Sequence, residues 1–226
     1  IFFLSVMKKV DNLATLRKKI IEQNIDKNEA IKYYSLMNRD LLNVIVLIAK
    51  SSNNLTISQE LTAYSSFLFS KESAGVERAI GVSTLSQDSF SKGMRAKFNN
   101  LIAEQNSYIN SFLHYSSADM KSSFEKAFKD SSITEVNRMR KIILESDEVG
   151  GFNIDSTHWF ITISKKIDLL KEIENEIAYN LRIDDIKLFE RMEVATRLSD
   201  LLHTAQLETA ATSGYIISNG KKFKKE

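Results

Sequence analysis

Two cations stand where the periodicity of residues 67–85 predicts the core side of a helix. Steps of three and four residues connect Lys71 and Arg78 along one stripe. The stripe consists of Tyr64, Leu68, Lys71, Gly75, Arg78 and Val82. A buried cation is costly unless it is paired, so both need a partner: Glu72, Glu77, a neighbouring helix or a bound anion. The alternative is that the stripe drifts to the surface and water solvates both charges.

Three stretches of the chain carry motifs specific enough to compare with a family. The first is K-E-x-A-G-x-E-R-A at 71–79, and the second is D-x-x-x-W-F-x-x-x-[ST]-x-K-I-D, which starts at Asp155. The third, L-L-H-x-x-Q-x-E within 201–216, includes Gln206. Together they resemble the nitrate- and nitrite-sensing (NIT) domains, which are sensor modules of bacterial chemoreceptors, kinases and antiterminators. The third stretch departs from that pattern at Thr209, where the family has arginine.

The order of these motifs differs from the family order, because the stretch that resembles the family's opening helix comes last. Three explanations stay open. The chain is a circular permutant, it is ordered unusually around a gap, or it begins inside one sensor repeat and ends inside the next. The resemblance implies a single all-helical sensor domain over residues 1–226, permuted or incomplete.

Composition favours long helices. The 226 residues are 43% apolar and 27% charged, which is ordinary for a soluble globular protein. Proline is absent, although average usage predicts roughly ten, and only 7 residues are glycine. Because cysteine is absent, a disulfide framework and a thiolate metal site are both excluded. A formal charge of +2 does not indicate nucleic-acid binding.

Apolar periodicity predicts an all-α fold of seven or eight helices, arranged as antiparallel bundles, with two four-helix bundles stacked end to end. Capping pairs predict where several helices begin: Asp26 with Glu29, Thr56 with Gln59, and Ser132 with Glu135. Short helices are expected after 116–119, a stop at Gly150-Gly151, and an Asp155 cap before a helix beginning near Trp159. That helix should bend near 180–185, and its periodicity continues to about residue 215.

A nitrate sensor needs planar, multivalent donors. Nitrate is a flat monoanion, and a guanidinium group matches two of its oxygens at once. The resemblance makes Arg78 the first candidate and gives Lys165 or Lys166 as the basic residue of the W-F helix. The predicted ligand-binding residues are Arg78, Lys71, Lys165, Lys166, Glu77 and Gln206. Arg138 and Arg140 have two interpretations: they compensate for the arginine that is absent at Thr209, or, as is more common for a pair on a helix after a capping box, they form a solvated helix face.

Nothing in the sequence indicates an enzyme or a cofactor. The three histidines are scattered, and no metal-ligand spacing, P-loop, dinucleotide fingerprint or nucleophile motif occurs. Trp159 and Phe160 are interpreted as core aromatics.

Two hypotheses follow. The first is the sensory domain of a bacterial signalling receptor that binds a small anion and relays helix movement to an output domain. It implies a homodimer, no nucleic-acid partner, and a periplasmic position beside membrane spans that flank this chain, with a cytoplasmic regulator as the alternative. The second is a ligand-free helical scaffold or dimerisation module that has lost the anion site, which Thr209 favours.

Overall fold

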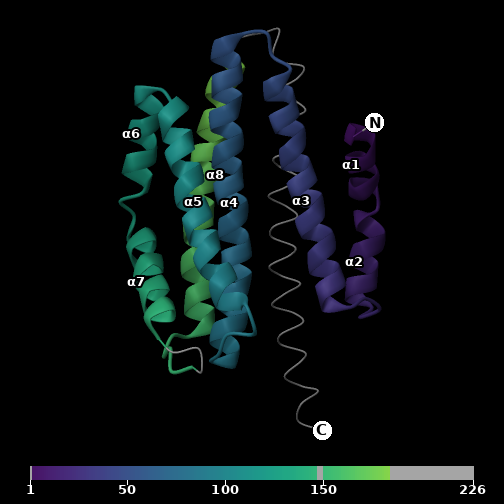
Figure 1. Cartoon of the computed structure of the whole chain (residues 1–226), viewed down its shortest axis with the longest axis vertical. Helices are drawn as coiled ribbons and strands as arrows, with labels where there is room; N and C mark the ends of the chain where they lie inside the picture. The colour runs from purple at the N-terminus through teal and green to yellow at the C-terminus, as the bar shows by residue number, and fades with distance from the viewer. Residues whose placement is uncertain (1, 147–149, 184–226) are drawn as a thin grey trace.

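The computed structural model of the protein describes residues 2–146 and 150–183, and every regular element in these two ranges is a helix (Figure 1). The helices are α1 (Phe2–Asp11), α2 (Leu13–Ile21), α3 (Lys27–Lys50), α4 (Leu55–Gln87), α5 (Met94–Tyr115), α6 (Ala118–Ala127), α7 (Ser131–Glu145) and α8 (Ser156–Ile183). The predicted all-α class is therefore confirmed. The bend predicted near 180–185 and the helix beyond it lie largely outside the described residues.

An up-and-down bundle forms the main body. Its four columns are α4, α5, the consecutive pair α6 and α7, and α8, and each column runs opposite to the one before it (Figure 1). Short connections between helices favour this antiparallel arrangement. The core between the columns is largely aromatic and aliphatic, and its buried members include Phe67, Phe98, Phe112, Phe152, Trp159, Ile163 and Ile167.

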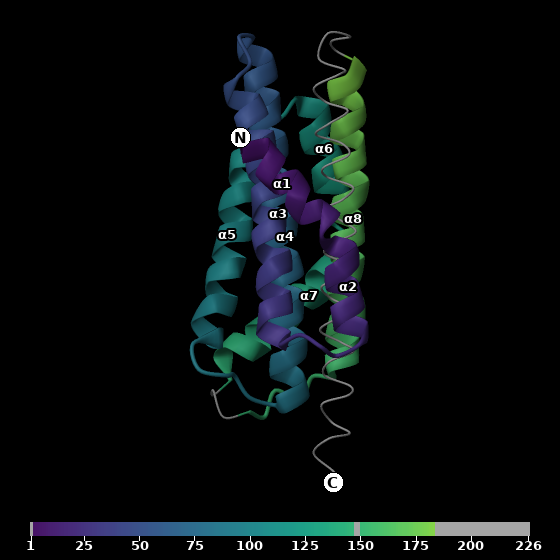
Figure 2. The same cartoon turned by 90° about the vertical axis from the view of Figure 1, so that its right-hand side faces the viewer.

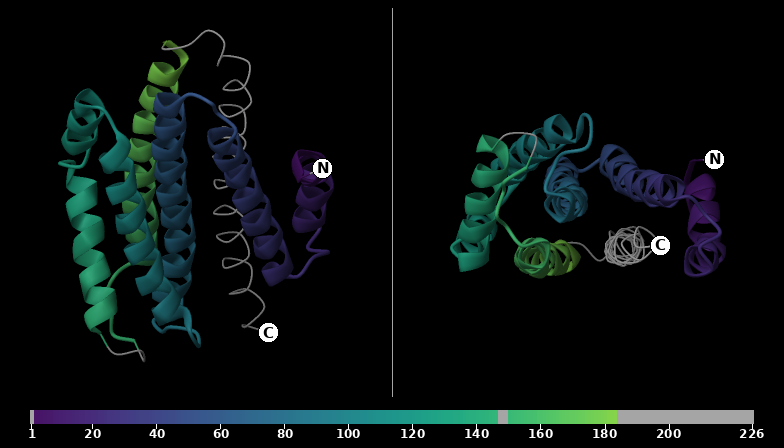
Figure 3. Two further views of the ribbon diagram at one scale, coloured as in Figure 1. Left: turned by 45° about the horizontal axis from the view of Figure 1, so that its top comes forward. Right: turned by 90° about the horizontal axis from the view of Figure 1, so that it is seen from below.

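The helix α4 is the central element. Residues 63–68 are buried at six consecutive positions, so this helix is covered on all sides. A helix buried all round belongs in the interior of a fold. Seen from below, α4 lies between α3 on one side and the α6–α7 column on the other (Figure 3). Lys71, Glu77 and Arg78 in the middle of α4 are buried, so they must find partners on neighbouring helices.

The first three helices lie beside this bundle. The turn at residues 51–54 reverses the chain, so α3 runs antiparallel to α4, and the Asn38 amide of α3 donates to the Glu72 carboxylate at 3.2 Å (Figure 2). A separate small core joins α1 and α2 to α3 through Val6, Leu13, Leu16, Tyr34, Met37, Leu41 and Val44. We expected a second bundle stacked on the end of the first, but α1, α2 and α3 lie along the side of the main bundle. The turn at residues 51–54 is short, so α3 folds back along α4.

Side-chain caps define several helix starts. The predicted caps Asp26 and Asp155 are confirmed, because each carboxylate accepts a hydrogen bond from a backbone N–H three residues later. Two predicted caps are wrong. The cap of α4 is Asn54, two residues before Thr56, and the cap of α7 is Asp130, two residues before Ser132. A carboxylate or amide at the earlier position reaches the first unbonded N–H groups of the helix, and the hydroxyl further on is then not needed.

Asp88 joins two loops at the lower end of the bundle. Its carboxylate accepts hydrogen bonds from the backbone N–H of Gly151, at 2.9 Å, and of Phe152, at 3.2 Å. Gly150 has φ +114°, and a Cβ atom there would lie 2.2 Å from the Asp88 carbonyl oxygen, so only glycine fits. The predicted Gly150-Gly151 stop is thus confirmed, and it fixes where the chain enters α8.

Trp159 sets the register between α8 and α4. Its indole N–H donates to the backbone carbonyl of Arg78 at 3.1 Å, and the ring is fully buried against Gly81. A Cβ atom on Gly81 would lie 2.2 Å from the indole nitrogen. The absence of a side chain at this position therefore allows α8 to approach α4 closely.

We expect Gly81→Ala to destabilise the protein, although alanine favours a helix by about 1 kcal/mol over glycine. The added methyl group must displace the indole, and overpacking of this kind costs about 1–3 kcal/mol. Thermal unfolding should show a lower melting temperature, while the control Ser86→Ala on the same helix should leave it nearly unchanged. Trp159→Phe should make Gly81→Ala less harmful than it is in the wild type. A Gly81→Ala protein as stable as the wild type would contradict the close packing.

Candidate anion site

Four helices of the bundle contribute one side chain each to a buried polar cluster. These are Glu77 from α4, Gln105 from α5, Arg140 from α7 and Lys166 from α8, here called the polar cluster. Each of the four is less than 10% exposed. Such a buried network is stable only when its donors and acceptors are matched, so its hydrogen bonds define what it can do.

Glu77 and Arg140 form a bidentate ion pair. The guanidinium Nε and Nη2 each lie 2.6 Å from one of the two carboxylate oxygens. Burial acts to raise the pKa of Glu77, but Arg140, helped by Lys166 and Gln105, brings this pKa below its ordinary value. The carboxylate is therefore ionised at neutral pH, and its negative charge is committed to Arg140.

Gln105 links this ion pair to the lysine. Its amide nitrogen donates to Glu77 at 2.8 Å and to the carbonyl of Leu101 at 3.0 Å. Its amide oxygen accepts from Arg140 Nη2 at 3.0 Å and from Lys166 Nζ at 2.7 Å. The amide thus makes four hydrogen bonds, and its oxygen end faces both cations.

Lys166 has little compensation for its charge. It is 5% exposed, and within the described residues its ammonium group makes one hydrogen bond, to the neutral oxygen of Gln105. An ammonium group has three N–H donors, so two of them have no described acceptor. Burial, and after it the charge of Arg140, lower the pKa of Lys166, and Glu77 offsets only part of this effect, so the resulting pKa is about 7. The lysine therefore changes its protonation near neutral pH.

A cavity of about 280 Å³ borders the polar cluster. Gln105, Arg140 and Lys166 form its polar wall together with Ser70, Asn106 and Asn137. Its remaining wall is apolar and is formed by Ile109, Phe124, Phe128, Ile133 and Leu170. A water molecule takes roughly 30 Å³ of liquid volume, so this cavity has room for a small anion and several waters.

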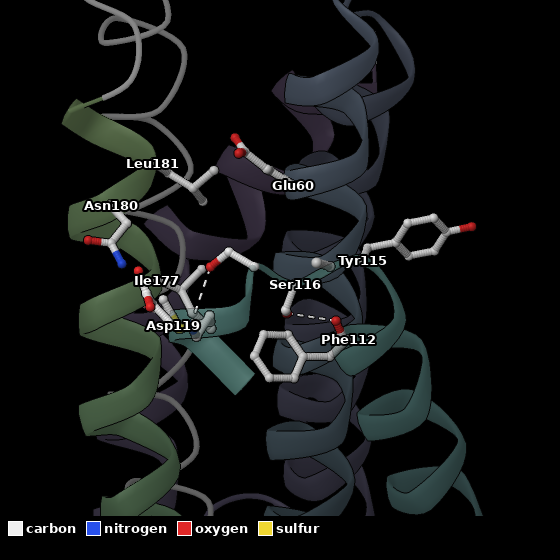
Figure 4. Close-up of a pocket in the computed structure, with 11 residues that line it drawn as sticks. Glu60, Phe112, Tyr115, Ser116, Asp119, Ile177, Asn180 and Leu181 are labelled. Carbon is white, nitrogen blue, oxygen red and sulfur yellow. Dashed lines mark hydrogen bonds between the residues drawn. The ribbon is translucent and has the colours of Figure 1, made fainter. Parts of the chain in front are cut away.

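A second pocket, of about 330 Å³, lies where α4 and α6 begin and α5 and α8 end (Figure 4). Its polar lining includes the carboxylates of Glu60 and Asp119 and the amide of Asn180, and no lysine or arginine occurs among its described lining residues. Two carboxylates repel an anion. The cavity at the polar cluster is therefore the better candidate for an anion.

The remaining predicted site residues lie elsewhere. Lys71 is buried in an ion pair with Glu174 of α8, and burial lowers the pKa of this lysine while Glu174 raises it. Lys165 is exposed, and Gln206 lies outside the described residues. Of the five predicted residues that lie in the described ranges, the structure places Glu77 and Lys166 in the polar cluster.

Arg78 is buried, as predicted, but faces a different part of α8 from Lys71. Its Nη1 donates to the Ser164 hydroxyl at 2.9 Å, and its guanidinium lies 5.3 Å from the centre of the Phe160 ring. Ser164 and Glu174 are ten residues apart on α8, about 15 Å along the helix axis. Lys71 and Arg78 therefore make separate contacts.

Phe160 is 38% exposed, so its interpretation as a core residue is wrong, whereas Trp159 is a core residue as predicted.

Arg140 and Gln105 were not among the predicted ligand-binding residues. Arg140 was interpreted as a solvated residue, but it is 9% exposed, whereas Arg138 does lie on the exposed face and pairs with Glu135. The signal was present: Arg140 falls on the apolar stripe of its helix with Ile133, Val136 and Ile143, and Gln105 falls between Leu101 and Phe112. A polar residue inside an apolar stripe is the same pattern that identified Lys71 and Arg78.

The comparisons with known proteins now bear on this site. The family described as nitrate and nitrite sensing, NIT, matches residues 3–182 of the chain. The chain belongs to the NIT family. The match contains the K-E-x-A-G-x-E-R-A and W-F motifs in their family order and ends before the third motif, so the rotated order depends on residues outside the match and outside the described structure.

Two known proteins are similar to this NIT chain. The nitrate regulatory protein of Klebsiella oxytoca is 25% identical over 169 residues, which cover 75% of this chain and 42% of that protein. The solved structure of the NasR transcription antiterminator is similar with a TM-score of 0.73 at 22% identity, covering 99% of this chain and 61% of that one. The chain thus spans less than half of the first relative, and the structural likeness confirms the helical fold.

The lowered pKa of Lys166 predicts that the anion-free protein becomes more stable as the pH rises from about 7 towards 10.5. The first value is the pKa of Lys166 in the folded protein, and the second is the ordinary pKa of a lysine side chain. In this range the unfolded chain binds a proton that the folded chain lacks, so the free energy of unfolding rises, by at most about 1.4 kcal/mol per pH unit for one proton.

Denaturant unfolding at several pH values measures this slope. Because Lys71 contributes with the same sign, the informative quantity is the difference between the wild type and Lys166→Met, which should lose its share of the slope. The exposed neighbour provides the control, since Lys165→Met should keep the wild-type slope. Equal slopes in the wild type and Lys166→Met would show that Lys166 stays protonated.

Proposed function

We propose that this NIT domain is a sensor that binds a small monovalent anion, of the nitrate or nitrite type, in the cavity at the polar cluster. The observation that supports the proposal best is the charge of the cavity wall. Arg140 and Lys166 bring two positive charges to one cavity, and Glu77 supplies one negative charge. A bound monoanion would supply the missing negative charge.

The donors around the cavity suit such an anion. Lys166 has two N–H groups without a described acceptor, and Arg140 uses one Nη1 donor on Asn137 at 3.1 Å and keeps another. The apolar wall excludes water from one side, which strengthens charge-assisted hydrogen bonds. Nitrate has three weakly basic oxygens in a plane, so it can accept from Lys166 and Arg140 at the same time.

The position of the cluster gives a route from binding to helix movement. An anion at Lys166 and Arg140 competes with Glu77 and Gln105 for the same donors. The two cations stand on α7 and α8, whereas the two acceptors stand on α4 and α5. Binding would therefore favour one arrangement of these helix pairs over another, which is a shift between populations. We propose that this shift is the signal passed to an output domain.

The class of protein that carries this sensor, its partners and its location are also proposals. The name of the Klebsiella oxytoca relative describes a regulator of nitrate response, which supports a regulatory protein without enzymatic activity over a chemoreceptor. Homodimer formation, the absence of a nucleic-acid partner and a periplasmic position stay predictions from the sequence. Within the described residues, no helix combines the length and apolar character needed to cross a membrane.

The ligand-free scaffold is the second candidate. It is favoured by the ion pairs that the protein already makes within itself, Lys71 with Glu174 and Arg140 with Glu77. A scaffold, however, gains nothing from Lys166, whose charge is compensated by one neutral oxygen. This residue therefore separates the two candidates.

We expect nitrate or nitrite to raise the melting temperature of the wild-type protein at pH 6.5, where Lys166 is protonated. An anion at one hundred times its dissociation constant should stabilise the fold by about 2.7 kcal/mol. Lys166→Met should weaken binding about tenfold to a hundredfold or more, because each charge-assisted hydrogen bond contributes about 1.5–3 kcal/mol.

The matched control is Lys165→Met, which removes the same charge from the adjacent exposed position and should keep the wild-type response. Equal losses in the two variants would indicate a general charge effect and not a site. If no anion in a panel of nitrate, nitrite, chloride and small carboxylates stabilises the wild type, the cluster is structural and the scaffold is correct.

A further inference from the structure

Resting on the proposed function, we infer that Gln105 is the residue that determines the valence of the bound anion. Its neutral amide leaves the polar cluster with one uncompensated positive charge, so the cavity accepts a monoanion and rejects a dianion such as sulfate. The inference concerns selectivity, whereas the proposal above concerns binding.

The charge count is simple. With Lys166 protonated, Arg140 and Lys166 contribute +2 and Glu77 contributes −1, so the cluster carries +1. Gln105 contacts all three charged groups, within 2.7–3.0 Å, and adds no charge. A glutamate of the same shape would bring the sum to zero. The choice of amide over carboxylate at this one position therefore decides whether the cavity needs an anion.

Size does not explain selectivity in this cavity. Its volume of about 280 Å³ exceeds what a tetrahedral oxyanion needs, so sulfate and nitrate both fit by volume. A dianion, however, would leave a net charge of −1 in a site walled by Phe124, Phe128 and Leu170. An unpaired charge beside this apolar wall is unfavourable, although the exposed Asn106 and Asn137 open the opposite side of the cavity to solvent. Charge therefore discriminates where volume does not.

The surroundings of Lys166 support this count. The charged groups that act on it are Glu77 from α4 and Arg140 from α7, while α5 supplies the neutral Gln105 and α6 supplies Phe124 and Phe128. On its own helix, Lys165 is exposed. Burial is the main cause of the lowered pKa of Lys166, about 7, and the charge of Arg140 adds to it. Anion binding should consequently take up about one proton above pH 7 and weaken about tenfold per pH unit there.

Three variants of the full chain test the charge count. Gln105→Glu adds a negative charge, Glu77→Gln removes one, and the double variant Glu77→Gln with Gln105→Glu exchanges amide and carboxylate while keeping the sum at +1. Titration calorimetry with nitrate and with sulfate at pH 6.5 and constant ionic strength measures binding. Circular dichroism and thermal unfolding of each variant without anion show whether it folds.

We expect a graded order of affinities. Gln105→Glu should lose nitrate binding about a hundredfold or more, because a unit charge placed within hydrogen-bond distance of the site opposes the anion. Glu77→Gln removes the carboxylate that raises the pKa of Lys166, so the sum reaches +2 only when a bound anion holds the Lys166 proton. This variant should therefore take up a proton when it binds sulfate, which the wild type does not bind. The double variant should bind nitrate within about tenfold of the wild type and again reject sulfate.

A purely structural role of Gln105 predicts a different pattern, in which every variant loses nitrate and none gains sulfate. The pH profile adds a second criterion, since Gln105→Glu should move the titration of Lys166 upwards by stabilising its protonated form. Should Glu77→Gln not fold even with sulfate, the double variant and Gln105→Glu still decide the question.

The failures of the two proposals differ in their results. A wild type that binds nitrate and sulfate equally overturns the inference on Gln105 and leaves the anion site intact, as does a Gln105→Glu protein that folds and binds nitrate with wild-type affinity. A wild type that binds no anion at any pH overturns both.

Discussion

The burial of α4 on every side is the constraint on which the rest of the structure depends. A central helix that carries Lys71, Glu77 and Arg78 cannot leave them to water, so each surrounding helix must present a matching group at the correct height. The matches are Glu174 and Ser164 on α8 and Arg140 on α7. These polar contacts specify the register of the bundle in a way that an apolar core alone does not. The Gly81–Trp159 contact and the Asp88 loop junction reinforce the same register.

Lys166 is matched less completely than Lys71 and Arg140. Lys71 has a carboxylate partner and Arg140 has another, whereas Lys166 has an amide oxygen. A sequence optimised only for stability would place a carboxylate or an apolar side chain in that position, since a buried cation with a neutral partner lowers stability. Local departures from the rules of stability are typical of functional sites. The cavity beside Lys166 has a mixed polar and apolar wall, and an anion bound there would supply the charged partner that Lys166 lacks.

The sequence predicted that two cations, Lys71 and Arg78, lie on the core side of α4, because helical periodicity alone reveals it. The same rule applied to α5 and α7 would have identified Gln105 and Arg140. What periodicity could not predict is which partner each charge meets. Glu77 was a candidate partner for Arg78, its neighbour in sequence, but adjacent helix positions point about 100° apart, so Glu77 faces α7 and Arg78 faces α8. Pairings such as Lys71 with Glu174 span a hundred residues and depend on helix register, which only tertiary packing fixes.

The helices differ in how firmly they are held against α4, and this difference would let a rigid bundle respond to the proposed ligand. The contacts of α4 with α8 through Trp159, Lys71 and Arg78 are buried and mutually supporting, so they resist displacement. The column formed by α6 and α7 is instead broken at residues 128–130 and meets the central helix through Arg140. A change in what Arg140 and Lys166 bind is therefore more easily accommodated by a small shift of α7 than by movement of α8 against α4. Because Glu77 and Gln105 hold the other ends of the same hydrogen bonds, such a shift would alter the contact of α7 with both α4 and α5. The proposed anion would act on the bundle in this way.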